Sequence, residues 1–225
     1  MIGNQKKILA FSLTAVLLAA LFVFSINTGS LSVSPGQLLR GLFVEYDPEV
    51  ATVYDLRFPR IFISMLGGAA TAVSGVLLQA ALKNPLADPG IIGISSGASL
   101  AAVLITAFLP QLYFFTPMFA FLGGLAAFAM VYGLSWKGGL SPLRIILVGV
   151  AVSAMFTGLM SAFNSGTGSN YSGVASIVNA NITMKTWDDF KTLAIYSAAG
   201  LIASLFVARR CDLLTLAVSY THLTL

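Results

Sequence analysis

Charged side chains are scarce in this sequence. Asp, Glu, Lys and Arg make up 9% of its 225 residues, whereas hydrophobic residues make up 57%. A soluble domain carries about 25% charged residues. Because so few charges cannot cover the surface of a globule, lipid must be the solvent for much of this chain. The composition therefore predicts an integral membrane protein.

Cysteine and histidine are almost absent, with one of each at Cys211 and His222. One cysteine excludes a disulfide within the chain and a multi-cysteine metal site. One histidine leaves an imidazole-based metal site, a proton relay or a base-activated serine without its parts. The sequence also lacks the G-x-x-x-x-G-K-[ST] pattern of an ATP-binding P-loop. We therefore expect no metal site, no bound cofactor and no enzymatic activity in this chain.

Basic residues are present, but they form no stripe. The net charge is +4, and the twelve lysines and arginines are scattered singly or in pairs at the ends of apolar runs. Nucleic-acid binding proteins gather such residues on one face instead. The expected partner of this surface is a lipid bilayer and not a nucleic acid.

Long apolar runs dominate what remains. A helix needs roughly 18 or more apolar residues to cross about 30 Å of hydrocarbon. Proline and glycine mark several ends of the runs, because proline lacks an N–H and disfavours a helical residue before it. The sequence predicts an all-α, polytopic transmembrane helix bundle with six spans, at residues 8–26, 61–82, 91–109, 112–136, 143–163 and 192–208.

The cores of these predicted spans contain no ionisable residue. Ion-coupled carriers usually need one, so a transporter of this kind draws its energy from elsewhere or is a passive pore. Small residues recur at four-residue spacing, which lets helices approach closely in lipid. We interpret these stripes as helix packing, with the lining of a transport path as the alternative. They are Gly67, Thr71 and Gly75; Gly93 and Gly97; and Gly149, Ser153 and Thr157.

The distribution of basic residues favours a cytoplasmic N-terminus, by seven on the inner side to five on the outer side. In this orientation residues 27–60 and 164–191 are long outer loops, and residues 83–90 form an inner turn. Ser34 followed by Pro35 predicts a short helix in the first outer loop. Asp88 before Pro89 is a candidate N-cap for the third span.

The most specific pattern occupies residues 57–99, RFPRIFISMLGGAATAVSGVLLQAALKNPLADPGIIGISSGAS. It combines a basic start, two small-residue helices and a polar turn between them. It resembles the signature of the iron-siderophore, haem and cobalamin family of ABC transporter permeases. The family's pattern is R-x-P-R, then G-A and S-G-x-x-x-Q, then N-P-L-A-D-P-x-x-x-G-x-S-x-G-A. Chance similarity between apolar segments would not reproduce the polar turn as well.

The resemblance implies the permease subunit of a binding-protein-dependent ABC importer in the cytoplasmic membrane. Its cargo would be a ferric siderophore, haem or cobalamin. Its partners would be a second permease subunit, identical or different, a cytoplasmic ABC ATPase dimer that binds ATP and Mg²⁺, and an extracytoplasmic substrate-binding protein. Arg57 and Arg60 match residues that dock the binding protein. The inner turn is either a helix-stop device or part of the gate or ATPase contact; it comprises Asn84, Pro85, Leu86, Ala87, Asp88, Pro89 and Gly90.

The resemblance covers residues 1–216, as the N-terminal part of a permease domain with six of an expected ten helices. It departs at residues 177–182, where the family often has W-x-x-G-S-L. Residues 217–225 do not follow the family pattern, so we expect a truncated chain with a foreign or frame-shifted tail. The alternative functions are a secondary carrier, a passive channel, or a structural membrane fragment that does not transport.

Overall fold

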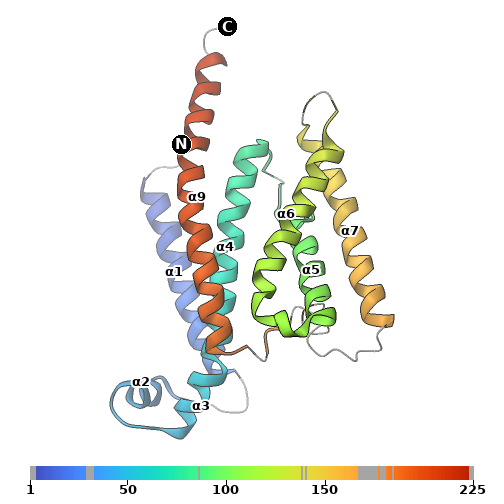
Figure 1. The fold of residues 1–225 in the computed structure, drawn as a ribbon. Helices are drawn as coiled ribbons and strands as arrows, with labels where there is room; N and C mark the ends of the chain where they lie inside the picture. The colour runs from blue at the N-terminus through green and yellow to red at the C-terminus, as the bar shows by residue number, and fades with distance from the viewer. Residues whose placement is uncertain are drawn as a thin grey trace. The chain divides into compact units, whose positions relative to one another are not determined.

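The computed structural model describes residues 4–28, 33–85, 87–137, 139, 141–166, 177, 181–183 and 185–222, with side chains described from residue 5 to residue 208 within those ranges. The described residues form helices and their connections, without a strand, which confirms the all-α prediction (Figure 1). The helices are α1 (Asn4–Asn27), α2 (Pro35–Phe43), α3 (Pro48–Leu56), α4 (Phe58–Leu82), α5 (Ile94–Phe108), the 3-10 helix η1 (Pro110–Phe115), α6 (Thr116–Ser135), α7 (Pro142–Gly166) and α9 (Trp187–His222).

Five helical stretches in the described part of the chain are long and apolar enough to cross a membrane. They are Gln5–Asn27, Pro48–Leu82, Pro110–Ser135, Pro142–Gly166 and Trp187–Ala208. Five of the six predicted spans are therefore matched. The third is the 15-residue helix α5, which is shorter than the predicted span at residues 91–109. Its start is delayed because the turn before it continues to Gly93, whose φ of 86° is left-handed.

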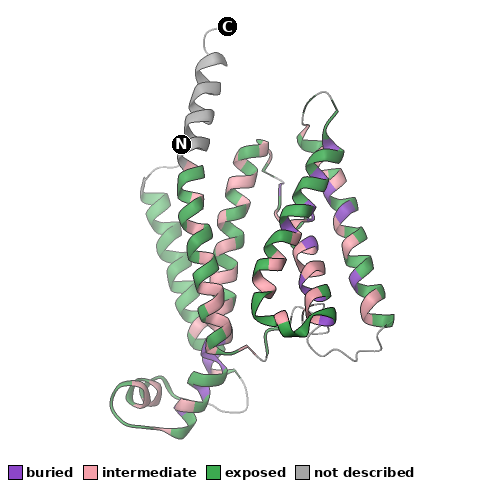
Figure 2. Ribbon diagram, in the orientation of Figure 1, coloured by how far each residue is buried: buried purple, intermediate pink, exposed green. Residues whose placement is uncertain are grey.

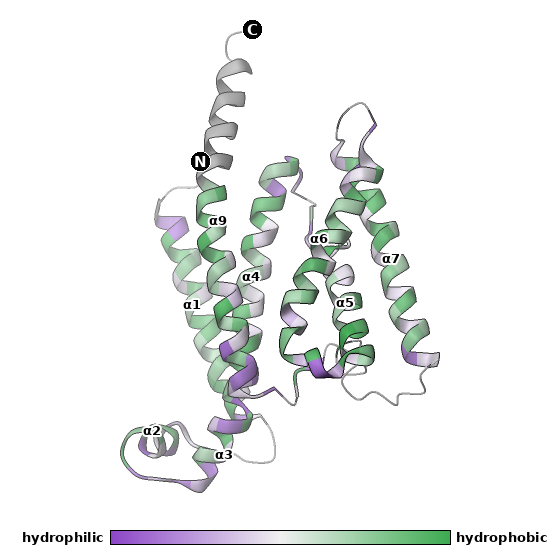
Figure 3. Ribbon diagram, viewed as in Figure 1, coloured by the Kyte–Doolittle hydropathy of each residue, from purple (hydrophilic) through white to green (hydrophobic). Residues whose placement is uncertain are grey.

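The long helices expose most of their apolar surface. In the membrane-length windows the buried share runs from 0% in α1 to 22% in α7. Figure 2 shows α1 and the described part of α9 mostly exposed, and Figure 3 shows that these same surfaces are hydrophobic. Exposed apolar surface on this scale is stable in lipid and not in water. The fold is that of a multi-pass membrane protein.

The chain divides into two compact units, which are described separately. Unit 1 comprises Met1–Gly68 and Thr183–Ser197, and unit 2 comprises Ala69–Ile182 and Ala198–Leu225. Helices α4 and α9 each contribute to both units.

Unit 1 contains two short helices that start in the same way. Ser34 Oγ accepts a hydrogen bond from Gln37 N at 3.1 Å at the start of α2. Asp47 Oδ1 accepts from Glu49 N at 2.9 Å at the start of α3. Both caps are followed by proline at the first helical position, which needs no N–H donor. The helix predicted after Ser34 is confirmed, whereas α3 was not predicted although Asp47-Pro48 carries the same signal.

The core of unit 1 lies where α3 ends and α4 begins. Its buried side chains come from four segments of the chain and comprise Ile26, Val33, Val50, Val53 and Phe58. Aromatic rings of α1, α4 and α9 pack against this core. Phe22 stacks on Phe58 with ring centroids 5.8 Å apart, and Trp187 lies 5.9 Å from Phe62. These contacts join the start of α9 to the start of α4 across more than a hundred residues of sequence.

Unit 2 is built on α5, α6 and α7, which approach closely at glycines. A Cβ atom added to Gly97 would lie 2.4 Å from Ala127 Cβ of α6, and one added to Gly149 would lie 2.8 Å from Ile92 Cα. Ser96 Oγ donates to Ser153 Oγ at 3.3 Å and so connects α5 with α7. Two apolar clusters complete the packing, one around Val103 and the other around Val131 and Val152.

Candidate functional site

Arg57 lies where three helices meet. Its backbone N–H donates to Val53 O at 2.9 Å and closes α3, and its carbonyl accepts from Ile61 N at 3.1 Å in the first turn of α4. Its guanidinium Nη1 donates to Ile26 O near the end of α1. The residue is only 8% exposed. The side chain predicted to dock a binding protein is therefore used inside unit 1.

Arg60 has a different environment. It is half-buried, and its Nε donates to Leu56 O at 2.6 Å. That bond uses one of the five N–H donors of the guanidinium. Among the described residues, the ion pairs found do not include Arg60. Of the two predicted docking residues, Arg60 keeps its charge available and Arg57 does not present its charge at the surface.

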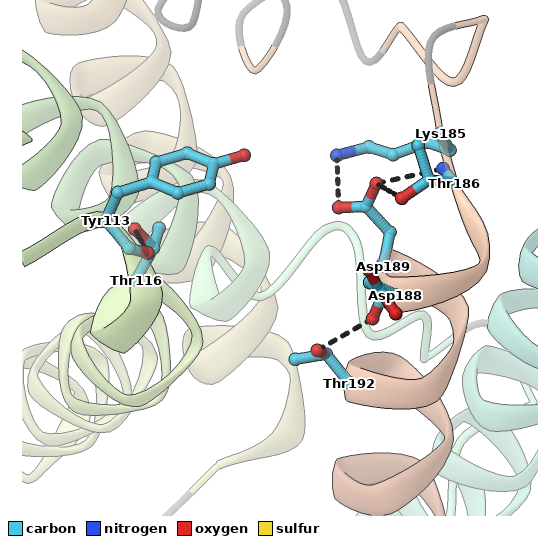
Figure 4. Close-up of polar contacts among 7 residues, drawn as sticks. All are labelled: Tyr113, Thr116, Lys185, Thr186, Asp188, Asp189 and Thr192. Carbon is cyan, nitrogen blue, oxygen red and sulfur yellow. Dashed lines mark hydrogen bonds and ion pairs between the residues drawn. The ribbon is translucent and has the colours of Figure 1, made fainter.

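Polar residues at the start of α9 form a local network (Figure 4). Asp189 Oδ2 accepts from Thr186 N at 3.0 Å and from Thr186 Oγ1 at 3.2 Å, which caps the helix. Lys185 Nζ lies 3.4 Å from Asp189 Oδ1, and Lys191 Nζ lies 2.9 Å from Asp188 Oδ1. A separate contact in Figure 4 is that of Thr116 Oγ1 with Tyr113 O, at 2.6 Å, at the η1–α6 junction. Both lysines in this segment are thus paired with acids.

A polar hollow of about 820 Å³ lies between α2 and α3. Gln37 Nε2 donates to Asp47 Oδ2 at 2.8 Å across it, and Arg40 Nε lies 3.9 Å from Glu45 Oε2 at its edge. The hydrogen bond from Gln37 lowers the pKa of Asp47, and bonds from the backbone N–H groups of Val50 and Glu49 lower it further. These polar contacts of Asp47 and Arg40 in the hollow thus join residues of α2, α3 and the turn between them.

The inner turn is held to the end of α4 by Gln79. Gln79 Nε2 donates to Ala87 O at 3.3 Å, and Gln79 O accepts from Asn84 N at 3.1 Å. Lys83 reverses the chain with a left-handed φ of 49°, and Ala87 N donates to Asn84 O at 3.1 Å. Ala87 is 2% exposed, so the turn is packed rather than extended into solvent. Leu86 lies outside the described residues.

Asp88 does not cap the third helix, which corrects that prediction. Its Oδ1 accepts from Gly90 N at 2.7 Å and closes a local turn. The N-cap of α5 is Gly93, which has no side chain to offer. Pro85 and Gly90 are exposed and Pro89 is half-buried. The motif therefore forms one compact turn in which Asp88 shapes the backbone.

The predicted small-residue stripes divide into two kinds. Gly93, Gly97 and Gly149 are buried and lie where segments of unit 2 approach closely. Ser153 of α7 accepts a hydrogen bond from Ser96 of α5. A Cβ added to Gly67 would meet nothing within 4 Å, and one added to Gly75 would meet only Pro89 Cδ at 3.8 Å. Thr71 and Thr157 are exposed. The stripe on α5 and the first part of that on α7 thus serve packing in this chain.

The sequence did not predict that Gln79 holds the turn, nor that the rings of Tyr54, Trp187 and Phe190 meet. Tyr54 and Trp187 lie 4.9 Å apart between ring centroids, and Trp187 and Phe190 lie 5.8 Å apart. Trp187 Nε1 is buried without a hydrogen-bond partner among the described residues. Aromatic residues near a span end are a signal for an interfacial position, but that signal does not say which rings meet.

Comparison with known proteins gives concordant results. A model of the "FecCD transport family" matches residues 17–221. The "Probable heme-iron transport system permease protein IsdF" of Staphylococcus aureus strain MSSA476, and that of strain MW2, are each 38% identical over 216 residues. The match covers 96% of this chain and 65% of the relative, so the chain spans slightly less than two thirds of these relatives.

A solved structure presented as an inward-facing conformation of a metal-chelate type ABC transporter is also similar. It is 28% identical with a TM-score of 0.65, and the match covers 98% of this chain and 68% of that one. The family match includes the arginine segment, the inner turn and the packed glycines described above. The chain belongs to the FecCD transport family.

Proposed function

We propose that this chain is the membrane-spanning permease subunit of a binding-protein-dependent ABC importer that moves an iron complex across the cytoplasmic membrane. The observation that carries the proposal is the family match over residues 17–221, which contains the whole pattern at residues 57–99. Relatives named as heme-iron permeases support an iron complex as cargo, with haem as the first candidate before a ferric siderophore or cobalamin.

The energy for transport would come from a partner. The cores of the predicted spans contain no ionisable residue that could carry a coupling ion, and the sequence has no P-loop. In the proposed importer, a cytoplasmic ATPase dimer that binds ATP and Mg²⁺ supplies the energy for transport. The proposed assembly contains a second permease subunit, identical or different, and the path for the cargo would lie between the two subunits.

Two parts of the segment at residues 57–99 have separate proposed roles. The segment with Arg57 and Arg60 would receive the substrate-binding protein on the outer side, where guanidinium groups recognise carboxylates in a salt-sensitive way. The turn at residues 84–90 would lie on the cytoplasmic side, near the gate and the ATPase, and the N-terminus would be cytoplasmic. The packed turn and the exposed Pro85 and Gly90 support a surface of defined shape there.

Uptake by the reconstituted transporter tests the proposal. Proteoliposomes that contain the permease and its ATPase are supplied with ATP inside and with the binding protein outside. We expect uptake of one iron complex that requires both ATP and the binding protein, with haem, a ferric siderophore and cobalamin measured in parallel. Uptake that proceeds without ATP would contradict the proposal. If a protonophore then abolishes it, the chain is a secondary carrier, and if not, a passive channel.

A further inference from the structure

An aromatic ladder, formed by Phe128, Tyr132 and Trp136, runs along α6 to its end. Neighbouring rings are in contact, with centroids 6.0 Å apart between Phe128 and Tyr132 and 5.6 Å apart between Tyr132 and Trp136. All three side chains are exposed. Residues four apart stand one above the other on a helix, so the ladder is a continuous apolar strip on the surface of unit 2.

The length of the ladder suits a lipid tail. Trp136 follows Phe128 by eight residues, which is a rise of about 12 Å along the helix axis. One leaflet of the hydrocarbon layer is about 15 Å deep, half of the full thickness of about 30 Å. Tyrosine and tryptophan favour the edge of this layer, because their rings are apolar but carry one polar group. The ladder therefore spans most of a leaflet, with Trp136 at the level of the headgroups.

Two basic side chains lie at the Trp136 end of the ladder. Lys137 follows Trp136 directly and is exposed, and Arg144 is half-buried near the start of α7. Arg144 Nη1 donates to Ser135 O at 3.2 Å and to Lys137 O at 3.4 Å. The end of α6 and the start of α7 lie at the same end of unit 2 (Figure 1). The guanidinium therefore reaches the backbone on both sides of Trp136.

These two positive charges lie in a part of the chain without acids. No Asp or Glu occurs between Asp88 and Asp188, and Lys137 and Arg144 are the only charged residues at positions 89–182. The ion pairs found among the described residues include neither of them. The last carbonyls of α6 offset about half of one charge. Since the guanidinium has five N–H donors and these bonds use Nη1, donors and charge remain for an anion.

A simpler interpretation treats Trp136 and Lys137 as general interfacial anchors and Arg144 as a residue that closes α6. Anchors of this kind accept any headgroup. The arrangement at the end of α6 is more specific, because cations from two helices meet beside one apolar strip. An anionic phospholipid fits both parts, since its phosphate accepts charge-assisted hydrogen bonds and its tail is apolar. The two interpretations differ in whether the site selects the charge of the lipid.

We propose that the end of α6 and the start of α7 form a binding site for an anionic phospholipid. Lys137 and Arg144 bind the headgroup, and the ladder of Phe128, Tyr132 and Trp136 contacts one acyl chain. The inference goes beyond the proposed function, because it depends on neither the cargo nor the energy source. It predicts that the bound lipid is selected by its charge.

Retention of lipid by the full chain tests the proposal. The chain is placed in nanodiscs of equal parts phosphatidylglycerol and phosphatidylcholine with identical acyl chains. Native mass spectrometry then counts the lipids that remain bound after transfer to detergent. The unfolding temperature in detergent is measured with added phosphatidylglycerol, phosphatidylcholine or inorganic phosphate. Lys7→Gln is the matched control, because it removes one positive charge from an exposed residue of α1.

We expect the parent chain to retain phosphatidylglycerol in preference to phosphatidylcholine and to be stabilised by it, but not by inorganic phosphate. Lys137→Gln and Arg144→Gln should each lower the preference about fivefold, the effect of one basic residue near an anionic surface. Lys137→Glu should abolish it, and Arg144→Lys should keep part of it. Trp136→Leu should lower the retention of both lipids alike, because it removes a ring and no charge. Lys7→Gln should match the parent.

Four results would overturn the proposal. They are equal retention of the two lipids by the parent chain, an unchanged preference in Lys137→Glu, an equal loss in Lys7→Gln, and equal stabilisation by inorganic phosphate. The third would indicate a response to net charge alone, and the fourth a site for a free anion. If Arg144→Gln does not fold, the Lys137 variants decide the question, since the contact of Lys137 with Arg144 uses its backbone carbonyl.

Discussion

At the scale of single residues, glycine has two separate uses in unit 2. Gly97 and Gly123 lie where α5 and α6 approach, and an added Cβ atom would come within 2.4 Å of an alanine Cβ in each case. Gly133 of α6 and Gly158 of α7 have open space around the same position, with nothing within 4 Å. Sequence spacing identifies small residues but cannot tell these uses apart, because it does not show which helix faces which.

Gly97→Ala is expected to destabilise unit 2. The added methyl overlaps Ala127 Cβ and lies 3.0 Å from Gly123 O, and overpacking of this kind costs about 1–3 kcal/mol. Gly133→Ala and Gly158→Ala are the matched controls, and they should be neutral or gain up to about 1 kcal/mol from helix propensity. Thermal unfolding of the purified variants in one detergent measures all three. Equal stabilities would mean that α5 and α6 are not packed as described.

The candidate site could be predicted in part at this scale. The pattern at residues 57–99 identified Arg57, Arg60 and the inner turn, because the residue types and their spacing are specific. The burial of Arg57 could not be predicted, since it depends on Ile26, a residue 31 positions earlier in the chain. Asp88 was wrongly expected to cap α5. An aspartate before Pro-Gly can either cap the helix that follows or close a local turn, and here its Oδ1 accepts a hydrogen bond from Gly90 N.

At the scale of elements, the α2–α3 hairpin shows how local capping signals build structure. Ser34-Pro35 and Asp47-Pro48 each begin a nine-residue helix. Asp47 also accepts the side-chain bond from Gln37, so one carboxylate caps α3 and joins it to α2. Helices this short are marginal alone, so the hairpin depends on such bonds and on the buried residues Val50 and Val53.

The hairpin should loosen in acid through Asp47. Its pKa in the folded chain is lowered, chiefly by the Gln37 hydrogen bond. A lowered pKa means that the carboxylate stabilises the fold above the ordinary aspartate value of about 4 and that this contribution is lost as pH falls through the folded value. Hydrogen–deuterium exchange of peptides covering α2 and α3, corrected for intrinsic rates, should therefore accelerate below about pH 4.

Asp47→Asn and Asp55→Asn separate this effect from general acid unfolding. Asp47→Asn should already exchange faster at neutral pH and should show little further change in acid. Asp55→Asn, at an exposed residue of α3, should behave like the parent chain. A parent-like pH profile for Asp47→Asn would show that another group controls the hairpin.

At the scale of the whole molecule, composition and apolar run length were sufficient to predict the all-α class and the five membrane-length helical stretches of the described residues. The predicted third span exceeded α5 because hydropathy cannot detect the left-handed turn at Gly93. The missed helix α3 adjoins α4 so closely that Pro48–Leu82 forms one apolar stretch. The contacts that join Trp187 to Tyr54 and Phe62 were beyond prediction, because they connect segments far apart in the sequence.

The proposed orientation can be measured with single cysteines. In a Cys211→Ser background the chain has no other thiol. We expect Pro85→Cys, in the inner turn, to react with a membrane-impermeant maleimide only from the cytoplasmic side. Tyr46→Cys, at a residue that is 79% exposed, should react only from the outside. Labelling of both positions from the same side would contradict the topology.

The shortness of α5 has an electrical consequence. Its 15 residues extend about 22 Å, whereas the hydrocarbon layer is about 30 Å thick. The irregular backbone at its ends therefore needs water or protein partners at a depth where lipid offers none. Where water supplies these partners, the insulating layer would be thinner, and the transmembrane voltage would fall over a shorter distance beside α5 than beside α7. A charged cargo that passed there would meet a steeper field along a shorter path.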